Sequence, residues 1–327
     1  MHTPVAFIIF NRPDTTERVF AALRAAKPRK LFVIADGPRP GRPDDVAKCA
    51  AARAIIDRVD WECEVHRNFA EHNLGCGQRP ATGLSWVFEH VDRAIILEDD
   101  CVPHPSFFRY CDELLERYAD DERVMMVSGN NFLPDGGAMP HSYTFFRFLN
   151  LWGWATWRRA WQGYDFEMKS WPSRRRAGWV RALSPDPRIQ RFWSKIYDSV
   201  YTHISLRDIW DYQFAYSVME RGGLGIAPSC NLVSNIGWGA DATHTTGTSD
   251  LAALPAREME FPLRHPTAVE YDQAYDELVF NTVFSRPGSD NRRKLARVRD
   301  ALSERVPLDL KRWWFERSRR GGAGGKS

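Results

Sequence analysis

Short apolar runs recur along the first part of the chain, and each is followed by a segment with apolar residues at helical spacing. Such runs fit strands buried on both faces, and the segments between them fit amphipathic helices. Strands that alternate with helices predict right-handed βαβ units and a parallel sheet. We therefore expect an α/β fold with a mostly parallel, Rossmann-like sheet flanked by helices. The predicted strands are residues 5–10, 31–35, 63–66, 94–97 and 124–128.

The predicted helices include one with a recognisable start and one with a recognisable end. Residues 14–17, Asp-Thr-Thr-Glu, have the spacing of a capping box and precede an apolar stripe. The Gly-Gly pair at 222–223 ends another helix, as glycine commonly does. The helix that this pair ends is residues 209–221, and the remaining predicted helices are residues 46–59, 82–91, 106–118 and 189–200.

No internal repeat and no linker-like stretch occurs before about residue 285. We therefore expect one domain over residues 1–285, composed of a half at 1–128 and a half at 129–285. A basic C-terminal extension covers residues 286–327.

Polar residues follow three of the predicted strands where each strand ends. They are residues 11–13 (Asn-Arg-Pro), 36–38 (Asp-Gly-Pro) and 98–100 (Glu-Asp-Asp). In open parallel sheets the carboxyl ends of the strands share one edge, and ligands bind there. We expect the three clusters to converge at that edge.

The third cluster places Glu98, Asp99 and Asp100 directly after an apolar strand. Three carboxylates this close repel one another, so their pKa values rise unless a cation lies among them. Hard divalent cations take oxygen ligands and bridge carboxylates to substrate phosphates. The cluster therefore indicates a metal–diphosphate site for Mn²⁺ or Mg²⁺. The alternative is an acidic loop that favours the dipole of the helix predicted to begin near Ser106.

Composition narrows the class of protein. The apolar content of 43% and charged content of 27% are those of a soluble globular protein. The six cysteines are scattered without a Cys-x-x-Cys pair, which favours reduced thiols over a zinc site or a disulfide framework. The first apolar run is too short for a signal peptide, and no run reaches membrane-spanning length. We expect a cytoplasmic protein.

Tryptophan is abundant, with 13 residues, and aromatic side chains often line carbohydrate-binding surfaces or pack in cores. Trp154, Trp157 and Trp161 have helical spacing, and we interpret them as a helical stripe that packs into the core.

The net charge of +3 is unevenly distributed. From Asn291 onward the chain carries 12 Lys or Arg and 4 Asp or Glu, a net +8, which leaves −5 on the first 290 residues. Residues 309–320 join two tryptophans and a phenylalanine to a basic majority. On a helix this pattern is typical of a peripheral membrane anchor, which would lie near lipid-linked molecules. The alternative is a helix packed on the body, and the acidic body argues against nucleic acid as a partner.

The order of these motifs resembles metal-dependent nucleotide-sugar glycosyltransferases of the GT-A fold, in particular bacterial family-2-like proteins akin to the animal Golgi transferases that add branching N-acetylglucosamine. The resemblance implies a nucleotide-sugar-binding half at 1–128 and an acceptor-binding half at 129–285. It spans about residues 4–246 and leaves the C-terminal extension without a counterpart. The residues that carry it are 10–13 (Phe-Asn-Arg-Pro), 36–37 (Asp-Gly), 73–79 (Asn-Leu-Gly-Cys-Gly-Gln-Arg), 98–100, 152–154 (Trp-Gly-Trp), 210–211 (Trp-Asp), 235–237 (Asn-Ile-Gly) and 244 (His).

The resemblance assigns roles in the acidic cluster. It makes Asp100 the direct metal ligand, Asp99 a ribose or water-bridged contact, and Glu98 a contact to the transferred sugar. Arg12 would bind a donor phosphate beside a helix N-terminus, where amide groups already favour an anion. The alternative for Arg12 is a surface residue next to a helix cap.

Further residues would complete the donor site. Asp36 would accept from a uracil N–H or a ribose hydroxyl, or would serve only an Asp-Gly turn. Arg79 would reach the base or the diphosphate, or would be a solvated charge at a helix end. Trp152 and Gly153 would form a sugar-facing wall, where glycine permits close approach. His244 would touch the diphosphate or metal from a loop that closes on binding, or would have no role.

Asp211 is the candidate general base, because displacement at an anomeric carbon needs a carboxylate that takes the proton of the acceptor hydroxyl. Attack opposite the leaving diphosphate would invert the configuration, by analogy with glycoside hydrolysis. Asp208, one turn earlier, is the rival, and both acids would otherwise only complement a helix dipole.

These inferences favour an inverting, metal-dependent glycosyltransferase that uses a UDP-sugar and acts on a glycan or lipid-linked acceptor in bacterial surface-polysaccharide synthesis. A sugar-nucleotide nucleotidyltransferase is the first alternative, although it would need a long Gly-rich loop after the first strand. The second alternative is a non-catalytic carbohydrate- or membrane-binding protein on a transferase scaffold.

Overall fold

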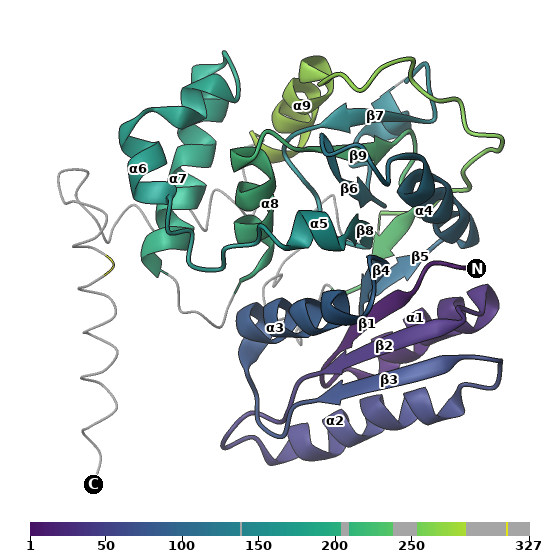
Figure 1. Ribbon diagram of the computed structural model, residues 1–327. Helices are drawn as coiled ribbons and strands as arrows, with labels where there is room; N and C mark the ends of the chain where they lie inside the picture. The colour runs from purple at the N-terminus through teal and green to yellow at the C-terminus, as the bar shows by residue number, and fades with distance from the viewer. Residues whose placement is uncertain (138, 204–208, 238–253, 286–311, 313–327) are drawn as a thin grey trace, which may run out of the picture.

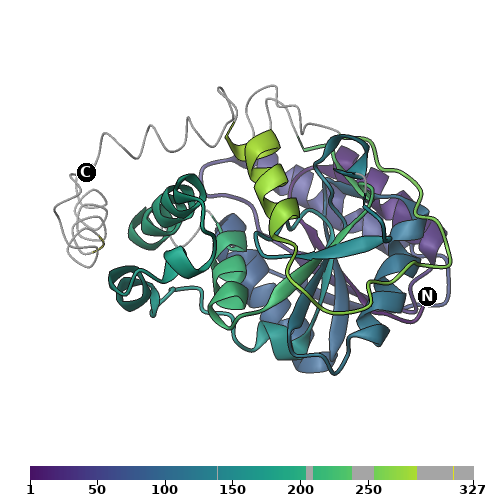
Figure 2. The same cartoon turned by 90° about the horizontal axis from the view of Figure 1, so that it is seen from above.

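The computed structural model describes residues 1–137, 139–203, 209–237, 254–285 and Arg312. Within them, an eight-stranded sheet has the order β3-β2-β1-β4-β8-β6-β9-β7 and carries helices on both faces (Figures 1 and 2), which confirms the predicted α/β class. The strands of the described chain are β1 (Val5–Ile9), β2 (Lys30–Ala35), β3 (Glu64–Phe69), β4 (Arg93–Glu98), β5 (Cys101–Pro103), β6 (Val124–Ser128), β7 (Tyr143–Phe146), β8 (Trp154–Trp157), β9 (Leu224–Pro228) and β10 (Val233–Asn235).

Most strands of the sheet share one direction. Strands β3, β2, β1 and β4 pair in parallel, so their carboxyl ends lie along one edge. Strand β8 runs antiparallel to both β4 and β6, β9 is parallel to β6, and β7 is antiparallel to β9. Only β7 and β8 therefore oppose the common direction, and the mostly parallel sheet is confirmed.

Helices cover the sheet on both sides and divide the core in two. Apolar side chains of α1, α2 and α4 join the core on one face, and those of α3 and α5 to α9 join the core on the other. The helices are α1 (Pro13–Ala26), α2 (Pro43–Ile55), α3 (Gly75–His90), α4 (Pro105–Arg117), α5 (Arg158–Trp161), α6 (Trp171–Arg176), α7 (Pro187–His203), α8 (Asp211–Glu220) and α9 (Gln273–Val279), with single turns at Ile56–Arg58, Pro134–Gly137, Trp179–Ala182 and Phe280–Phe284.

The burial of the strands explains the apolar runs of the sequence. Strand β1 is buried at every position, and β2 is buried at all positions except Lys30. Both strands lie inside the sheet with helices on either side, so neither face tolerates polar residues. Strand β3 forms the edge and is only partly buried, which accounts for its weaker apolar pattern.

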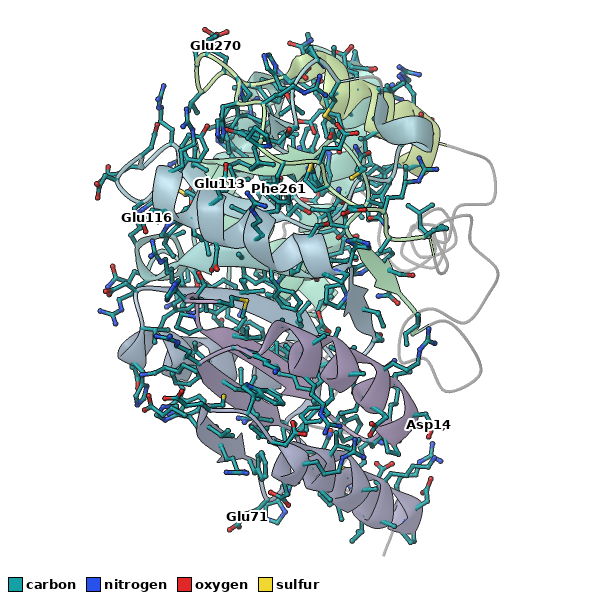
Figure 3. The ribbon with its side chains drawn as sticks, turned by 90° about the vertical axis from the view of Figure 1, so that its right-hand side faces the viewer. Asp14, Glu71, Glu113, Glu116, Phe261 and Glu270 are labelled. Atoms are coloured by element: carbon teal, nitrogen blue, oxygen red, sulfur yellow. The ribbon has the colours of Figure 1, made fainter. Side chains whose placement is uncertain are left out.

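The predicted capping box at residues 14–17 is wrong. Helix α1 already begins at Pro13, and Arg12 occupies the N-cap position without a side-chain cap. Asp14 lies in the first turn and points outward from the surface (Figure 3). Proline suits the first helical position because its missing N–H has no partner there in any case. The loop between β1 and α1 is therefore only three residues long.

The tryptophan stripe is also not helical. Trp154 and Trp157 belong to strand β8, and only Trp161 lies in a helix, the short α5. Residues three apart in a strand point to opposite faces, so Trp154 joins one core and Trp157 the other. The expected burial is confirmed, since the three side chains are at most 5% exposed.

The structure adds two observations on chain class. All six cysteines lie in the described part of the chain, and each is a free thiol. Among the described helices, none combines the length and the apolar character needed to cross a bilayer.

Candidate functional site

The three polar clusters converge at one edge of the sheet, as predicted. In the parallel register Ile9 lies beside Ala35, and Ile8 lies beside Glu98, so the residues that follow β1, β2 and β4 are neighbours. The backbone N–H of Phe10 donates to Asp99 Oδ2 at 3.1 Å.

Arg12 lies among the acids. From the N-cap of α1, its Nη2 atom forms an ion pair with Asp99 Oδ1 and a second one with Asp100 Oδ2 at 3.0 Å. Burial alone would lower the pKa of Arg12, but the two carboxylates outweigh that effect and raise it above its ordinary value. Arg12 therefore stays charged and partly neutralises the cluster.

One guanidinium does not neutralise the cluster completely. Burial raises the pKa of Glu98 well above its ordinary value, and the charges of Asp100, Asp99 and Asp211 raise it further. Burial also raises the pKa of Asp99 to about 6, against the opposing influence of Arg12. Three carboxylates beside one arginine carry an excess of negative charge, which protons or a second cation can neutralise.

The donor chemistry of the cluster fits a hard divalent cation. Asp99 has both oxygens engaged, one with Arg12 and one with the Phe10 N–H, whereas the side chain of Asp100 is 14% exposed. Glu98 is also partly accessible. Across the described residues, no three His, Cys, Asp or Glu side chains are arranged as a metal site. Mg²⁺ is usually held by one or two carboxylates together with substrate phosphates, so such a cage is not required.

Asp211 reaches the same region from another element. It is the first residue of α8, and its charge contributes to the raised pKa of Glu98. Its Oδ1 atom accepts from the Tyr212 N–H at 2.9 Å. The structure thus brings Asp211 within electrostatic reach of the acidic cluster.

Trp210, which precedes Asp211, has a packing role. Its side chain is 5% exposed and stacks on Trp154 of β8 with ring centroids 5.8 Å apart. Its backbone carbonyl accepts from the Tyr164 hydroxyl at 3.2 Å. Trp210 therefore anchors the start of α8 on the sheet, and its ring is too enclosed for a sugar face.

Asp36 is fully engaged in local structure. Its Oδ1 atom accepts from the N–H groups of Gly37 and Leu74, both at 2.8 Å. Its Oδ2 atom accepts from Asn73 Nδ2 at 2.9 Å and from the Gly75 N–H at 3.0 Å. Because a carboxylate offers about four acceptor positions, Asp36 has none left for a uracil or ribose group in this arrangement. Its carboxylate instead fixes the approach to α3.

Arg79 is not a solvated charge. It is 5% exposed, and its guanidinium donates to the carbonyl and side-chain oxygens of Asn68. Burial lowers the pKa of Arg79, and the nearby charge of Asp36 opposes that shift. Arg79 therefore joins β3 to α3 beside Asp36.

Gly153 and its neighbours form a packed turn. Gly153 has φ +69°, and a Cβ there would approach the Val233 side chain to 2.7 Å. The Trp152 ring packs edge-on against Phe132, and the backbone N–H of Trp152 donates to Asn130 Oδ1 at 3.0 Å. Glycine at 153 is thus required by backbone conformation and by contact with β10.

The structure adds Gly237, to which the sequence interpretation gave no role. Strand β10 pairs with β5, the strand that follows the acids, and the Ile236 N–H donates to the Asp100 carbonyl at 2.8 Å. A Cβ on Gly237 would lie 2.0 Å from Asp100 Oδ2. The sequence motif Asn-Ile-Gly at 235–237 is the feature from which a role for Gly237 could have been inferred. His244 and Asp208 lie outside the described residues.

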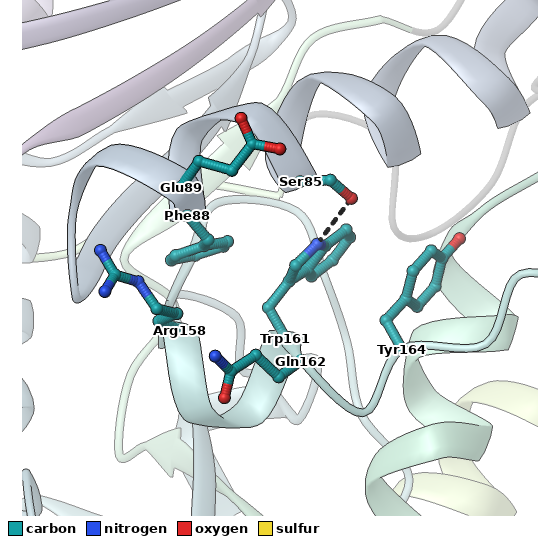
Figure 4. A pocket seen from close by; sticks show the side chains of 7 residues that line it. All are labelled: Ser85, Phe88, Glu89, Arg158, Trp161, Gln162 and Tyr164. Atoms are coloured by element: carbon teal, nitrogen blue, oxygen red, sulfur yellow. Dashed lines mark hydrogen bonds between the residues drawn. The ribbon is translucent and has the colours of Figure 1, made fainter.

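A surface pocket is lined by residues of α3, of α5 and of the segment after α5 (Figure 4). Trp161 Nε1 donates to Ser85 Oγ at 3.1 Å, and Tyr164 stacks on the Trp161 ring at 4.4 Å. Trp161 is 5% exposed, so its ring is covered rather than open to a ligand. The pocket lies by the last turns of α3, toward the opposite edge of the sheet from the acids. Its lining residues are Ser85, Phe88, Glu89, Arg158, Trp161, Gln162 and Tyr164.

Comparison with solved structures finds distant similarity to this chain. No protein-family model matches it, and no curated protein matches its sequence. Three solved structures align with 50% of the chain: S. aureus TarS 1-349 (TM-score 0.35, 8% identity, 48% of its length), HddC from Yersinia pseudotuberculosis (0.30, 10%, 80%) and a UDP-glucose pyrophosphorylase complexed with UDP-glucose (0.29, 8%, 79%). The chain thus matches less than half of the TarS fragment. Alignments this weak do not distinguish one activity from another.

Proposed function

We propose that this protein is an inverting, metal-dependent glycosyltransferase that transfers a sugar from a nucleotide donor, with UDP as the nucleotide, to a glycan or lipid-linked acceptor of the bacterial surface. One observation carries the proposal. An acidic cluster at the carboxyl edge of a parallel sheet contains one arginine and lies within electrostatic reach of a separate carboxylate, Asp211. Donor activation and acceptor deprotonation need these two functions side by side.

On the donor side, Asp100 would hold Mn²⁺ or Mg²⁺, with Glu98 next to it. A bound divalent ion would neutralise charge on the departing diphosphate. Arg12 would bind a phosphate oxygen through its planar guanidinium. Asp99 keeps Arg12 in place, and Asp36 and Arg79 shape the adjoining loop rather than contact the nucleotide.

On the acceptor side, Asp211 would accept the proton of the attacking hydroxyl. Its position at the start of α8 is fixed by Trp210, which is stacked on Trp154. A carboxylate that acts opposite the leaving diphosphate gives inversion at the anomeric carbon. His244 would contact the diphosphate, and Trp152 with Gly153 would border the transferred sugar.

The length of the first loop favours a glycosyltransferase over a nucleotidyltransferase. Only Phe10, Asn11 and Arg12 separate β1 from α1. A nucleotidyltransferase of similar architecture would need a long Gly-rich loop there to enclose a triphosphate. A non-catalytic binding protein would have no need of Asp211 within electrostatic reach of the acids.

Calorimetric titration of UDP with and without Mn²⁺ tests the donor site. We expect Mn²⁺-dependent UDP binding that falls at least about tenfold in Asp100→Ala, because the variant loses a metal ligand. Asp14→Ala, an exposed acid in the first turn of α1, is the matched control and should bind as the wild type does. UDP binding that ignores both Mn²⁺ and the Asp100 change would refute the donor site.

Turnover tests the base. A panel of sugar nucleotides, screened for donor hydrolysis, first identifies the donor. With donor and acceptor in hand, Asp211→Asn should reduce kcat by about 10²- to 10⁴-fold while UDP affinity stays near that of the wild type. Unchanged kcat in this variant would remove the proposed base.

A further inference from the structure

The ion pairs of Arg12 involve the carboxylate that the proposed function assigns to the metal. Arg12 Nη2 contacts Asp99 and Asp100 together, so a single guanidinium bridges the two acids. Asp99 and Asp100 are 4% and 14% exposed, and Arg12 is 24% exposed. Pairs this enclosed are screened much less than surface ion pairs.

The backbone around Gly237 closes one side of this arrangement. A Cβ at Gly237 would lie 2.0 Å from Asp100 Oδ2 and 2.9 Å from Arg12 Nη1. The Ile236 N–H fixes the same segment to the Asp100 carbonyl. Asp100 Oδ2 therefore has backbone on one side and the guanidinium on another, so little space is left for a third group.

A divalent ion and a guanidinium cannot both take the same carboxylate oxygen without strong repulsion, because each needs direct contact. We propose that Arg12 is an internal counter-cation that competes with the divalent metal for Asp100, so that the metal binds well only when a nucleoside diphosphate draws Arg12 away. This inference rests on the proposed function and adds an order of binding, in which the nucleoside diphosphate is needed for tight metal binding. Arg12 would exchange its carboxylate partners for phosphate oxygens, to which its planar fork is equally suited.

Mn²⁺ titration of the protein without nucleotide, with every variant at the same pH, tests this competition. We expect Arg12→Met to bind Mn²⁺ about tenfold more tightly than the wild type, because one repelling charge next to the ion is gone. Adding UDP should tighten Mn²⁺ binding strongly in the wild type and much less in Arg12→Met. Electron paramagnetic resonance of free Mn²⁺ reports the binding without any turnover.

Two further variants make the result interpretable. Arg67→Met removes the same charge from strand β3, where Arg67 forms an exposed ion pair with Asp57, and should bind Mn²⁺ as the wild type does. Arg12→Lys keeps a positive charge on a shorter side chain without the planar fork, so its Mn²⁺ affinity should lie between those of the wild type and Arg12→Met. Because Lys retains the charge, it also preserves the test if Arg12→Met fails to fold.

The outcomes separate this inference from the proposed function. Equal Mn²⁺ affinities in the wild type, Arg12→Lys and Arg12→Met without UDP, together with Mn²⁺-dependent UDP binding, would overturn the competition and leave the metal site intact. Failure of all these proteins to bind Mn²⁺, with or without UDP, would overturn both.

Discussion

Asp36 and Asp100 follow strands of the same sheet edge, but their carboxyl groups meet different surroundings. Asp36 accepts four hydrogen bonds, three of them from residues at the start of α3 and the loop before it. Asp100 accepts from Arg12 and keeps part of its surface accessible. One acid is therefore committed to structure, and the other can still take a ligand.

Replacing Asp36 should affect stability. In Asp36→Ala the N–H groups of Leu74 and Gly75 lose their acceptor inside a partly buried loop, which we expect to cost about 2 to 3 kcal/mol in the free energy of unfolding. Urea unfolding measures the loss. Asp60→Ala, which breaks an exposed pair with Arg24, should cost much less than Asp36→Ala because solvent screens exposed pairs. Similar losses in the two variants would mean that the Asp36 hydrogen bonds are unimportant for stability.

Asp36 and Asp100 were located because ligands bind at the carboxyl ends of parallel strands, but the sequence could not assign their roles. Asp36 is saturated because a loop 37 to 39 residues away folds over it. Gly237 likewise matters only because β10 pairs with β5, a long-range contact without a local pattern. Roles that depend on such contacts become visible only when the fold is known.

At the scale of elements, α9 is joined to strand β7 through buried polar groups. Asp276 is 2% exposed, and its Oδ2 atom accepts from the Arg147 N–H at 2.9 Å. Thr144 Oγ1 donates to Asp272 Oδ2 at 2.8 Å beside it. Burial raises the pKa of Asp276 from 3.8 to about 7.

This raised pKa predicts a pH dependence of stability. Between about pH 4 and pH 7 the unfolded chain releases the Asp276 proton while the folded chain retains it, so this residue lowers stability as the pH rises. Asp276→Asn cannot ionise and should lose this component. Urea unfolding measures the free energy of unfolding at about pH 5 and about pH 8. This free energy should decrease less between the two pH values in the variant than in the wild type. An identical decrease would place the ionisation of Asp276 elsewhere on the pH scale.

Elements with a continuous pattern were predictable, and those defined by distant partners were not. The five predicted strands all exist, and four of them, β1, β2, β4 and β6, are buried strands that need unbroken apolar runs. The sequence predicted a helix at strand β8 because tryptophans three residues apart match helical spacing, although in the strand they pack into opposite cores. Strands β5, β7, β9 and β10 went unpredicted, because each is defined by its pairing with a distant strand.

At the scale of the whole molecule, the basic extension meets the acidic body at one described point. Arg312 forms an ion pair with Glu167, and its guanidinium lies 4.9 Å from the centre of the Tyr201 ring. The side chain of Arg312 is 17% exposed. The other residues of the extension lie outside the described part of the chain, so the predicted membrane anchor at residues 309–320 stays a prediction.

Sedimentation with anionic vesicles compares the two interpretations of the extension. Deleting residues 286–327 removes a net positive charge together with two tryptophans, so a membrane anchor predicts loss of binding. Each basic residue near an anionic surface contributes about 1 kcal/mol. Glu167→Gln weakens the attachment of Arg312 to the body and should raise vesicle binding up to about fivefold, an effect that added salt reduces. Glu220→Gln, which affects a pair with Arg174 instead, is the control. If the deletion leaves sedimentation unchanged, the extension does not anchor the protein, and its contact with Glu167 and Tyr201 is a packing contact.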